Sequence, residues 1–403
     1  MIPTPPNFPK LDILASVLPD FASVCAARAL PPFDESIVAL LQDMSRHLLQ
    51  EPLAKDYPDV VAFAFWCRKG ALHQLRERYV STELRLGRGL VFHIAPGNVP
   101  VNFAYSLVAG LLAGNANIVR LPSREYPQVS MICDAFTELL ATYEHLRHHL
   151  AFIRYERDKA ITDLLSAHCD VRIIWGGDRA IHEIRQSPMP ERAFDVTFAD
   201  RYSLCVIDAA AYLGASDTAR IAQDFYNDTY LFDQNACTAP HLIVWLGLES
   251  QIKAAKSVFW GCLHKVVGDK YTLPPVAAVN KLSDAYHFAA QAENCHFQPM
   301  DDNMIVRIQL KQLEPGLEEW RSTSGCFFEF DAVALSDILP IINRKFQTLA
   351  YYGVDRTLLE RFVMDHRPSG IDRIVPIGRT LDFSLIWDGY DLIGTLSRVV
   401  SVI

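Results

Sequence analysis

Cys237 is the residue whose type and setting point most directly to chemistry. It lies in a short polar loop of small residues, between the apolar segment 230–232 and the strand-like segment 242–245. A cysteine in such a loop can reach a substrate, and its thiolate is a strong nucleophile. Because the pKa of a free cysteine is about 8.5, a nucleophile here needs a helix end or nearby dipoles to lower that value. The alternative is a packing role, since the chain has nine cysteines.

Asn98 is the second candidate. It occupies the middle of the turn Pro96-Gly97-Asn98-Val99-Pro100, which follows the apolar segment 90–94. Ligands of open α/β sheets bind at the carboxyl ends of parallel strands, and the rigid turn would hold one amide side chain there. An amide N–H directed at a developing oxyanion stabilises the transition state by about 3–4 kcal/mol. The alternative is a turn asparagine that caps the following helix, and the residues alone do not decide between the two roles.

Two further turns could hold a dinucleotide. Pro122-Ser123-Arg124 ends one strand-like segment and Gly176-Gly177 ends another, on what should be the same face of the sheet. Serine and arginine side chains suit phosphates, and glycines let the backbone approach a ligand closely. The G-x-G-x-x-G pattern is absent, so the sequence does not carry the Rossmann fingerprint.

Other polar residues indicate no metal site and no cysteine–histidine dyad. The cysteines are scattered without a C-x-x-C pair, so we expect neither a zinc site nor a disulfide framework. The histidines of segment 145–149 lie on a polar helix face and are expected to be solvated. His241 follows Cys237 by four residues, but in an extended segment this spacing does not bring the two side chains together.

The elements that must position these residues alternate between strands and helices. Segments 90–94, 103–112 and 117–121 predict a strand, a helix and a strand, which form a right-handed βαβ unit in a parallel sheet. Strands at 171–175 and 203–208 are expected to complete this half, and a second α/β half is expected to begin near Leu213. The fold class is therefore α/β, with ligands at the carboxyl ends of the strands.

The composition excludes several classes of function. The length of 403 residues suggests two or three domains. The net charge of -9, without a basic cluster, argues against a nucleic-acid partner. No apolar run reaches about 18 residues, so no membrane span is expected. The first residues lack the basic and apolar regions of a secretory signal, and we therefore expect a cytoplasmic protein with reduced thiols.

Four stretches in fixed order resemble the aldehyde dehydrogenase superfamily. They are His93–Pro100, Leu111–Ser123, Asp233–Pro240 and Arg373–Gly378. The likeness runs from about residue 85 to the C-terminus and is strongest to the acyl-CoA reductase branch, the fatty acid reductase component of bacterial bioluminescence systems. It implies an aldehyde-dehydrogenase-like fold, with a Rossmann-like cofactor domain, an α/β catalytic domain and a crevice between them.

We expect four regions on this basis. Residues 1–84 should form a helical N-terminal segment packed on the cofactor domain, and residues 85–212 the cofactor-binding domain. Residues 213–375 should form the catalytic domain, and residues 376–403 a C-terminal return that serves oligomerisation.

The resemblance also assigns roles to individual residues. Cys237 matches the cysteine that becomes acylated in the family, and Asn98 matches the asparagine that stabilises the oxyanion together with the nucleophile's own backbone N–H. NADPH is the expected cofactor, with NADH as the alternative. The residues expected to contact the cofactor are Pro96, Gly97, Arg120, Pro122, Ser123, Arg124, Gly176 and Gly177.

Two departures from the superfamily pattern bear on the reaction. Leu121 replaces the lysine that meets the adenosine ribose, and Ser123 and Arg124 are candidates to compensate; an arginine there would also suit a 2′-phosphate. The oxidising enzymes carry a general-base glutamate in the stretch that corresponds to 196–200, where this chain has none. A reductase must keep water from its thioester intermediate until hydride arrives, so the missing base favours reduction.

Three functions follow as hypotheses. The first is NADPH-dependent reduction of a long-chain fatty acyl thioester to the aldehyde, with acyl-CoA or an acylated partner protein, such as an acyl-activating synthetase, as the donor. The second is an aldehyde dehydrogenase that works in the oxidative direction. The third is an acyl carrier or scaffold subunit that accepts the acyl group without reducing it. A homo-oligomer is expected in each case.

Overall fold

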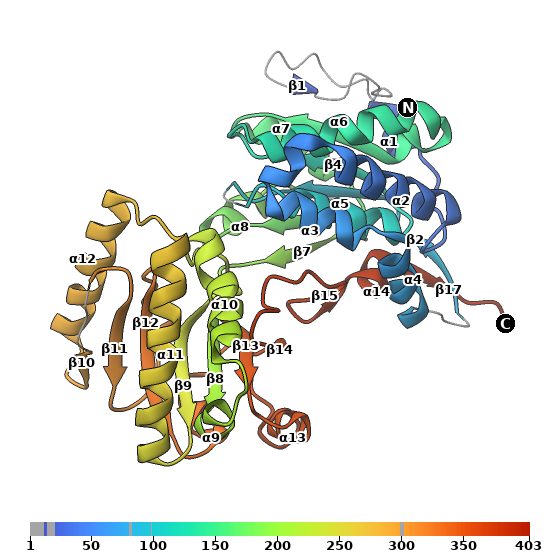
Figure 1. Cartoon of the computed structure of the whole chain (residues 1–403). Helices are drawn as coiled ribbons and strands as arrows, with labels where there is room; N and C mark the ends of the chain where they lie inside the picture. The colour runs from blue at the N-terminus through green and yellow to red at the C-terminus, as the bar shows by residue number, and fades with distance from the viewer. Residues whose placement is uncertain (1–11, 14–20, 80–82, 98, 299–301) are drawn as a thin grey trace. The chain divides into compact units, whose positions relative to one another are not determined.

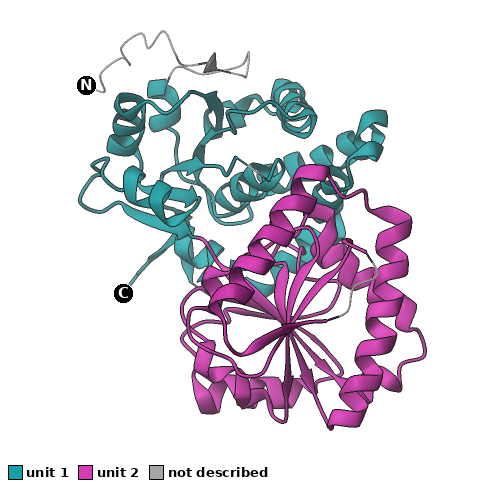
Figure 2. Ribbon diagram, turned by 90° about the vertical axis from the view of Figure 1, so that its left-hand side faces the viewer, with its two compact units in different colours: residues 1–199, 385–403 teal, residues 200–384 magenta. Residues whose placement is uncertain are grey.

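The predicted alternation of strands and helices forms two separate, mainly parallel sheets in the computed structural model, which describes residues 12–13, 21–79, 83–97, 99–298 and 302–403. The chain divides into unit 1, residues 1–199 and 385–403, and unit 2, residues 200–384 (Figure 2). The boundary thus falls after residue 199 instead of 212, because strand 202–208 pairs within the second sheet. The C-terminal return begins at residue 385 instead of 376.

Unit 1 is built on a sheet in the order β1-β5-β4-β3-β6-β7. All neighbours from β5 to β7 are parallel, and β1 is antiparallel to β5. In chain order the parallel part reads 3-2-1-4-5, the arrangement of a doubly wound dinucleotide-binding sheet. The strands of unit 1 are β1 (Asp12–Ile13), β2 (Leu84–Gly87), β3 (Leu90–Ile94), β4 (Ala116–Arg120), β5 (Leu150–Arg154), β6 (Val171–Trp175), β7 (Phe194–Phe198), β15 (Ile386–Trp387), β16 (Tyr390–Asp391) and β17 (Ser397–Val400).

The helices of unit 1 include the predicted helical N-terminal region. Phe63 and Trp66 of α3 both meet the ring of Tyr105 on α5 edge to face, at 5.2 and 5.3 Å between centroids. At the other end of the chain, β17 pairs antiparallel with β2. The helices are α1 (Phe21–Cys25), α2 (Glu35–Gln50), α3 (Pro58–Trp66), α4 (Lys69–Arg78), α5 (Asn102–Leu112), α6 (Pro127–Thr142), α7 (Lys159–His168), α8 (Asp178–Ile184) and α14 (Leu392–Leu396), with 3-10 turns η1 (Pro52–Asp56) and η2 (Glu144–His149).

Unit 2 is built on a sheet in the order β10-β11-β12-β9-β8-β13-β14. Only β10 is antiparallel to its neighbour. The strands are β8 (Tyr202–Asp208), β9 (Pro240–Leu246), β10 (Cys295–Phe297), β11 (Val306–Leu310), β12 (Cys326–Ala332), β13 (Phe346–Tyr352) and β14 (Arg373–Pro376). The helices are α9 (Ala209–Leu213), α10 (Thr218–Thr229), α11 (Glu249–Lys270), α12 (Pro275–Gln291) and α13 (Arg356–His366), with 3-10 turns η3 (Tyr230–Phe232), η4 (Leu317–Glu319) and η5 (Leu335–Ile341).

Helices cover both faces of the unit 2 sheet, which explains why its strands read as continuous apolar runs. Leu204 and Val206 of β8 pack into one core cluster, whereas Cys205 and Ile207 point to the cluster on the opposite face. Figure 1 shows α10 and α11 lying across the near face of this sheet. In the described part of the chain, no helix combines the length and the apolarity needed to span a membrane.

Candidate functional site

Cys237 lies at the amino-terminal edge of the unit 2 sheet, in the loop that joins η3 to β9. Its side chain is half-buried, unlike the fully buried Cys205 and Cys326. The Cys237 carbonyl accepts a hydrogen bond of 2.7 Å from the Oγ of Ser203, the second residue of β8. The nucleophile candidate is therefore tied to a neighbouring strand and is not part of the core.

Gln234 holds the beginning of this loop. Its side chain is 1% exposed, and its backbone, like that of Asp233, adopts the left-handed conformation, with φ of 61° and 51°. Its Nε2 donates to the carbonyls of Pro240 and Cys326, both at 3.0 Å. Its Oε1 accepts from the N–H groups of Gly325 and Cys326, at 3.0 and 3.2 Å. One amide thus joins the cysteine loop to the beginnings of β9 and β12.

The edge on which Cys237 lies differs from the general expectation for α/β sheets. Ligands are expected at the carboxyl ends of such strands, but Cys237 precedes β9 and lies with the first residues of the neighbouring strands. The same edge holds Gly325 before β12 and Arg373, the first residue of β14. Residues at the starts of strands therefore belong to the surroundings of Cys237.

Arg373 is the functional candidate that sequence reasoning missed. Its guanidinium donates to the carbonyls of Arg379, Thr380 and Asp382 in the turn after β14. That turn is held in place by Asp228 of α10, which is 2% exposed and accepts from the N–H groups of Gly378 and Thr380. Burial raises the pKa of Asp228 to about 6, although these hydrogen bonds oppose the shift. The stretch 373–378 carried part of the family likeness, but no spacing rule connects it to Cys237.

His241, which follows Cys237 by four residues, and Asp200, between β7 and β8, both have structural partners. His241 is 4% exposed, its Nδ1 bonds the Ser322 carbonyl, and its ring stacks on Tyr202 with 5.3 Å between centroids. Burial lowers its pKa to about 3, so the ring is neutral. Asp200 pairs with Arg321.

The three turns singled out in unit 1 follow adjacent parallel strands. Residues 95–101 follow β3, residues 121–126 follow β4, and Gly176-Gly177 follow β6. Because the chain order reverses between β3 and β6, these ends flank the topological switch point where dinucleotides bind in such sheets. Asn98 itself lies outside the described residues. On its N-terminal side, the Gly97 carbonyl accepts a hydrogen bond of 2.8 Å from the Tyr126 hydroxyl.

The two arginines of the second turn have different surroundings. The Arg120 guanidinium donates to the Tyr155 carbonyl and lies over the Tyr155 ring, 4.4 Å from its centroid. Arg124 is exposed and lies over the ring of Tyr126, at 5.1 Å. Ser123 and Gly177 are also exposed, Pro96 and Gly176 are half-buried, and Pro122 is buried. Arg124 is therefore the more accessible of the two arginines.

A buried polar chain fixes the strand ends behind these turns. Trp175 Nε1 donates to Ser106 Oγ at 3.0 Å, and Ser106 lies 2.8 Å from His93 Nδ1. His93 Nε2 lies 2.9 Å from Asn117 Oδ1. The Asn117 Oδ1 can only accept, and its identity is fixed because Asn117 Nδ2 donates to the carbonyls of Asn115 and His149. The proton of His93 is therefore on Nε2, and Nδ1 accepts from the Ser106 hydroxyl. Burial lowers the pKa of His93 to about 4, which agrees with this neutral tautomer.

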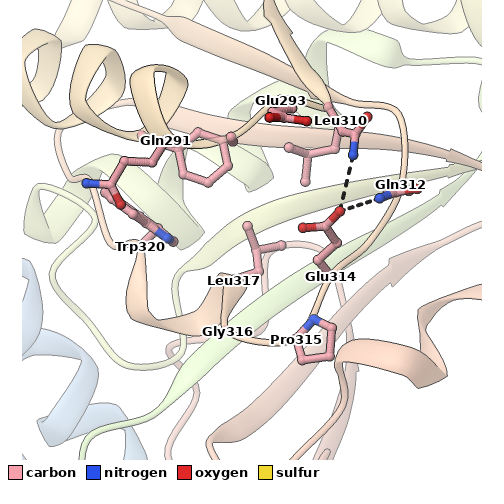
Figure 3. Close-up of a pocket in the computed structure, with 12 residues that line it drawn as sticks. Gln291, Glu293, Leu310, Gln312, Glu314, Pro315, Gly316, Leu317 and Trp320 are labelled. Carbon is pink, nitrogen blue, oxygen red and sulfur yellow. Dashed lines mark hydrogen bonds between the residues drawn. The ribbon is translucent and has the colours of Figure 1, made fainter.

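A cavity of about 260 Å³ opens elsewhere in unit 2, and Figure 3 shows it. Its lining includes Trp320, Leu317 and Glu314, and Glu314 accepts hydrogen bonds from Asn294 and Gln312. None of the residues predicted for the site lines it. Among the described residues, no three or more His, Cys, Asp or Glu side chains gather in a way that could hold a metal ion.

Comparison with known sequences points to one family. The sequence model described as "Acyl-CoA reductase (LuxC)" matches residues 26–295, and so includes Cys237 and part of the N-terminal helical region. A long-chain acyl-protein thioester reductase from Vibrio harveyi is 24% identical over 324 residues, which cover 78% of this chain and 63% of the relative. The protein of the same name from Photorhabdus luminescens is 22% identical over 384 residues, which cover 90% and 76%. The chain thus spans slightly less than two thirds of the length of the first of these relatives.

Comparison with solved structures confirms the predicted fold. Aldehyde dehydrogenase 21 from Physcomitrella patens superposes with a TM-score of 0.65 at 11% identity, covering 94% of this chain and 88% of the other. The 1-pyrroline-5-carboxylate dehydrogenase of Thermus thermophilus gives 0.62 at 12% identity, covering 95% and 83%. The chain therefore has an aldehyde-dehydrogenase-like fold.

Proposed function

The chain belongs to the acyl-CoA reductase (LuxC) family, and from this premise we propose that it reduces a long-chain fatty acyl thioester to the aldehyde through an acyl group carried on Cys237. The observation that carries the proposal is the half-buried Cys237 on a loop anchored by Gln234 and Ser203. The names of the relatives support a long-chain acyl thioester as the substrate class.

The proposed reaction begins with a transfer between sulfur atoms. The Cys237 thiolate attacks the thioester carbonyl, the donor's carbon–sulfur bond breaks, and the donor leaves as a thiol after taking a proton. When bound, NADPH supplies the hydride that converts the acyl carbon to an aldehyde. The Cys237 sulfur then leaves as the thiolate, so the enzyme returns to its starting state.

Asn98 is proposed to donate its amide N–H to the oxyanion, as the family resemblance suggests. The residue lies outside the described part of the chain, so this role rests on the sequence. Both flanks of the turn are anchored, by the Tyr126 bond to Gly97 and by a hydrogen bond of 3.2 Å from the Asn102 N–H to the Val99 carbonyl. Replacing one donor of an oxyanion hole lowers turnover about a hundredfold or more.

We propose that NADPH binds at the carboxyl edge of the unit 1 sheet. A Cβ added at Gly97 or Gly177 would meet no atom within 4 Å, so the backbone is open to a ligand at both turns. The exposed Ser123 and Arg124 would hold phosphates, and the arginine suits the 2′-phosphate that distinguishes NADPH from NADH. Pro96, Pro122 and Gly176 would shape the same turns.

The reductive direction is supported by the connection between β7 and β8. Residues 199–201 are the whole connection, and its one carboxylate, Asp200, is paired with Arg321. No glutamate is present there to activate water against an acyl-cysteine. The acyl group would therefore survive until hydride arrives.

The acyl donor and the assembly state are also part of the proposal. We propose an acylated partner protein, such as an acyl-activating synthetase, or acyl-CoA as the donor, with a cytoplasmic location. Among the described residues β17 pairs with β2 alone, and Leu84 and Val399 are 59% and 50% exposed. An exposed apolar edge of this kind favours pairing with a second copy.

The decisive experiment is the intact mass of the protein after mixing with tetradecanoyl-CoA or tetradecanoyl-N-acetylcysteamine, before and after NADPH is added. We expect an acyl adduct that NADPH discharges with release of tetradecanal. The adduct should be absent in Cys237→Ala and present in Cys262→Ala, which removes another half-buried cysteine of the same unit.

Other outcomes would contradict the proposal. An adduct that neither NADPH nor NADH discharges would indicate an acyl carrier, and such a carrier would also gain no thermal protection from NADPH. Acid formed steadily from tetradecanal and NADP⁺ would indicate the oxidative direction. No adduct from either thioester would mean that the donor is neither of these molecules, or that Cys237 is a packed cysteine.

A further inference from the structure

Arg373 has a fixed position on the edge that carries Cys237. It is the first residue of β14, its register partner on β13 is Thr348, and β13 in turn pairs with β8, the strand that binds the Cys237 carbonyl through Ser203. The three carbonyls that its guanidinium binds come from a single turn, residues 379–382. A planar fork held by several acceptors keeps one orientation.

The turn that holds Arg373 is itself attached to the helix that leads to Cys237. Asp228, on the last turn of α10, accepts N–H bonds of 2.6 and 3.1 Å from Gly378 and Thr380. Gly378 has a φ of 87°, and a Cβ there would lie 2.8 Å from the Cβ of Asp224, so no other residue fits. Because α10 continues through η3 into the cysteine loop, the arginine and the cysteine share one support.

The charges around Arg373 include the cysteine. Burial lowers the pKa of Arg373, and the carboxylates of Asp382 and Asp228 oppose that shift. A negative charge on the Cys237 sulfur raises the pKa of Arg373, as the two carboxylates do. The positive charge of Arg379 lowers it, as burial does. The two residues are also joined through the sheet, because Ser203 Oγ, which donates to the Cys237 carbonyl, accepts from the N–H of Thr348, the register partner of Arg373.

We propose that Arg373 is a positioning residue that favours the thiolate form of Cys237 through its fixed positive charge. The inference rests on the proposed function, because a thiolate is needed only if Cys237 is the nucleophile. A neighbouring cation stabilises a thiolate over a thiol, and cations are one of the usual means by which reactive cysteines are activated. A purely structural role for Arg373, as a staple of the turn 379–382, is the alternative.

The test measures ionisation of Cys237 directly, without substrate or cofactor. The rate of alkylation of Cys237 by iodoacetamide is followed between pH 5 and 10 by mass spectrometry of its peptide. We expect Arg373→Gln to raise the apparent pKa of Cys237 by about one pH unit, with about tenfold slower alkylation at pH values below that pKa. Arg373→Lys keeps the charge and should stay within about half a unit of the wild type.

Two controls separate this effect from structural damage and from net charge. Arg379→Gln removes an equal charge from the same turn, but that side chain is exposed and paired with Asp382, so the Cys237 profile should not move. Cys262 is a half-buried cysteine of the same unit, and its profile should be identical in all variants. Melting curves check that each variant is folded.

The outcomes decide as follows. A Cys237 profile unchanged in Arg373→Gln, or shifted equally in Arg379→Gln, overturns the inference. A shift of a full unit in Arg373→Lys also overturns it, and this arm remains decisive if Arg373→Gln does not fold. Because the assay needs neither acyl thioester nor NADPH, a shifted profile in a protein that forms no acyl adduct would leave the inference standing while the proposed function fails.

Discussion

Replacement of Gln234 by methionine should release the cysteine loop. Methionine has nearly the same length and an unbranched Cβ, so it fills the same space and tolerates the left-handed backbone of Gln234, with φ of 61°, as well as glutamine does. The four hydrogen bonds of the amide, two donated and two accepted, are lost together. The perturbation therefore removes polar contacts without creating a large cavity.

The expected magnitude follows from the groups left behind. The N–H groups of Gly325 and Cys326 lose their acceptor in a site where Gln234 is 1% exposed, so water does not replace it without opening the structure. An orphaned buried donor costs about 1–3 kcal/mol, which gives about 4 kcal/mol for the two. The carbonyls of Pro240 and Cys326 lose less, because a carbonyl oxygen has two lone pairs.

Hydrogen–deuterium exchange at Gly325 and Cys326 measures this cost locally, which suits a chain of two units that need not unfold in one step. A loss of 4 kcal/mol corresponds to about a thousandfold faster exchange. Gln291→Met removes an exposed amide of unit 2 and should change nothing. Unchanged exchange at Gly325 and Cys326 in folded Gln234→Met would refute the role given to this amide.

Gln234→Glu provides a second test, in which the direction of the change of stability with pH is predicted. One carboxylate oxygen would still accept from Gly325 and Cys326, but the other would face two carbonyls that need a donor. The ionised form is disfavoured, so the pKa of the new carboxyl in the folded protein lies above its unfolded value of about 4.3. Stability should then fall as the pH rises from about 4.3 through the folded pKa, and melting temperatures measured at pH 5 and pH 8 check this.

Two further predictions test other parts of the structure. Gly110→Ala should destabilise unit 1 by about 2 kcal/mol or more, because the new Cβ would lie 2.0 Å from Asn117 Oδ1. Gly261→Ala, in an open helical position, should instead stabilise unit 2 by about 0.5–1 kcal/mol. Thermal melts of the two variants measure both effects. The pKa of Asp228 is raised to about 6, so its ionisation costs stability as the pH rises from about 4 to about 6. Take the unfolding free energy of Asp228→Asn minus that of the wild type. This difference should be about 3 kcal/mol more favourable to the variant at pH 7 than at pH 4. An equal difference at both pH values would contradict the assigned burial.

Much of the architecture could be predicted because buried parallel strands leave a clear pattern. The apolar run Leu90–Ile94 and the turn after it are placed as predicted, with the turns after β4 and β6 on the same edge. The division after residue 199 differs from the predicted domain boundary at residue 212 for a physical reason. The strand Tyr202–Asp208 reads like any other buried strand, and only its pairing with β9 and β13 places it in the second sheet.

The site could be predicted only where local sequence carries it. Small neighbours identified Cys237 as a loop cysteine, and the half-buried side chain agrees with that interpretation. Gln234 and Arg373 could not be found in this way, because their partners lie far along the chain. The role of the Gln234 amide can be recognised only when Gly325 is known to lie beside it. The role of Arg373 can be recognised only when the sheet order places β14 next to β13.

The position of Cys237 before a strand explains why so many distant residues are needed. A turn at the carboxyl end of a strand leads directly into a helix, whose first N–H groups and dipole help to stabilise negative charge. The loop at the amino end of β9 has no helix after it, and α10 approaches it with its carboxyl end, which carries partial negative charge. A thiolate there needs compensation from side chains. Gln234 and Ser203 supply the rigidity, and Arg373, held through its turn by Asp228, is the cation that we propose supplies the charge.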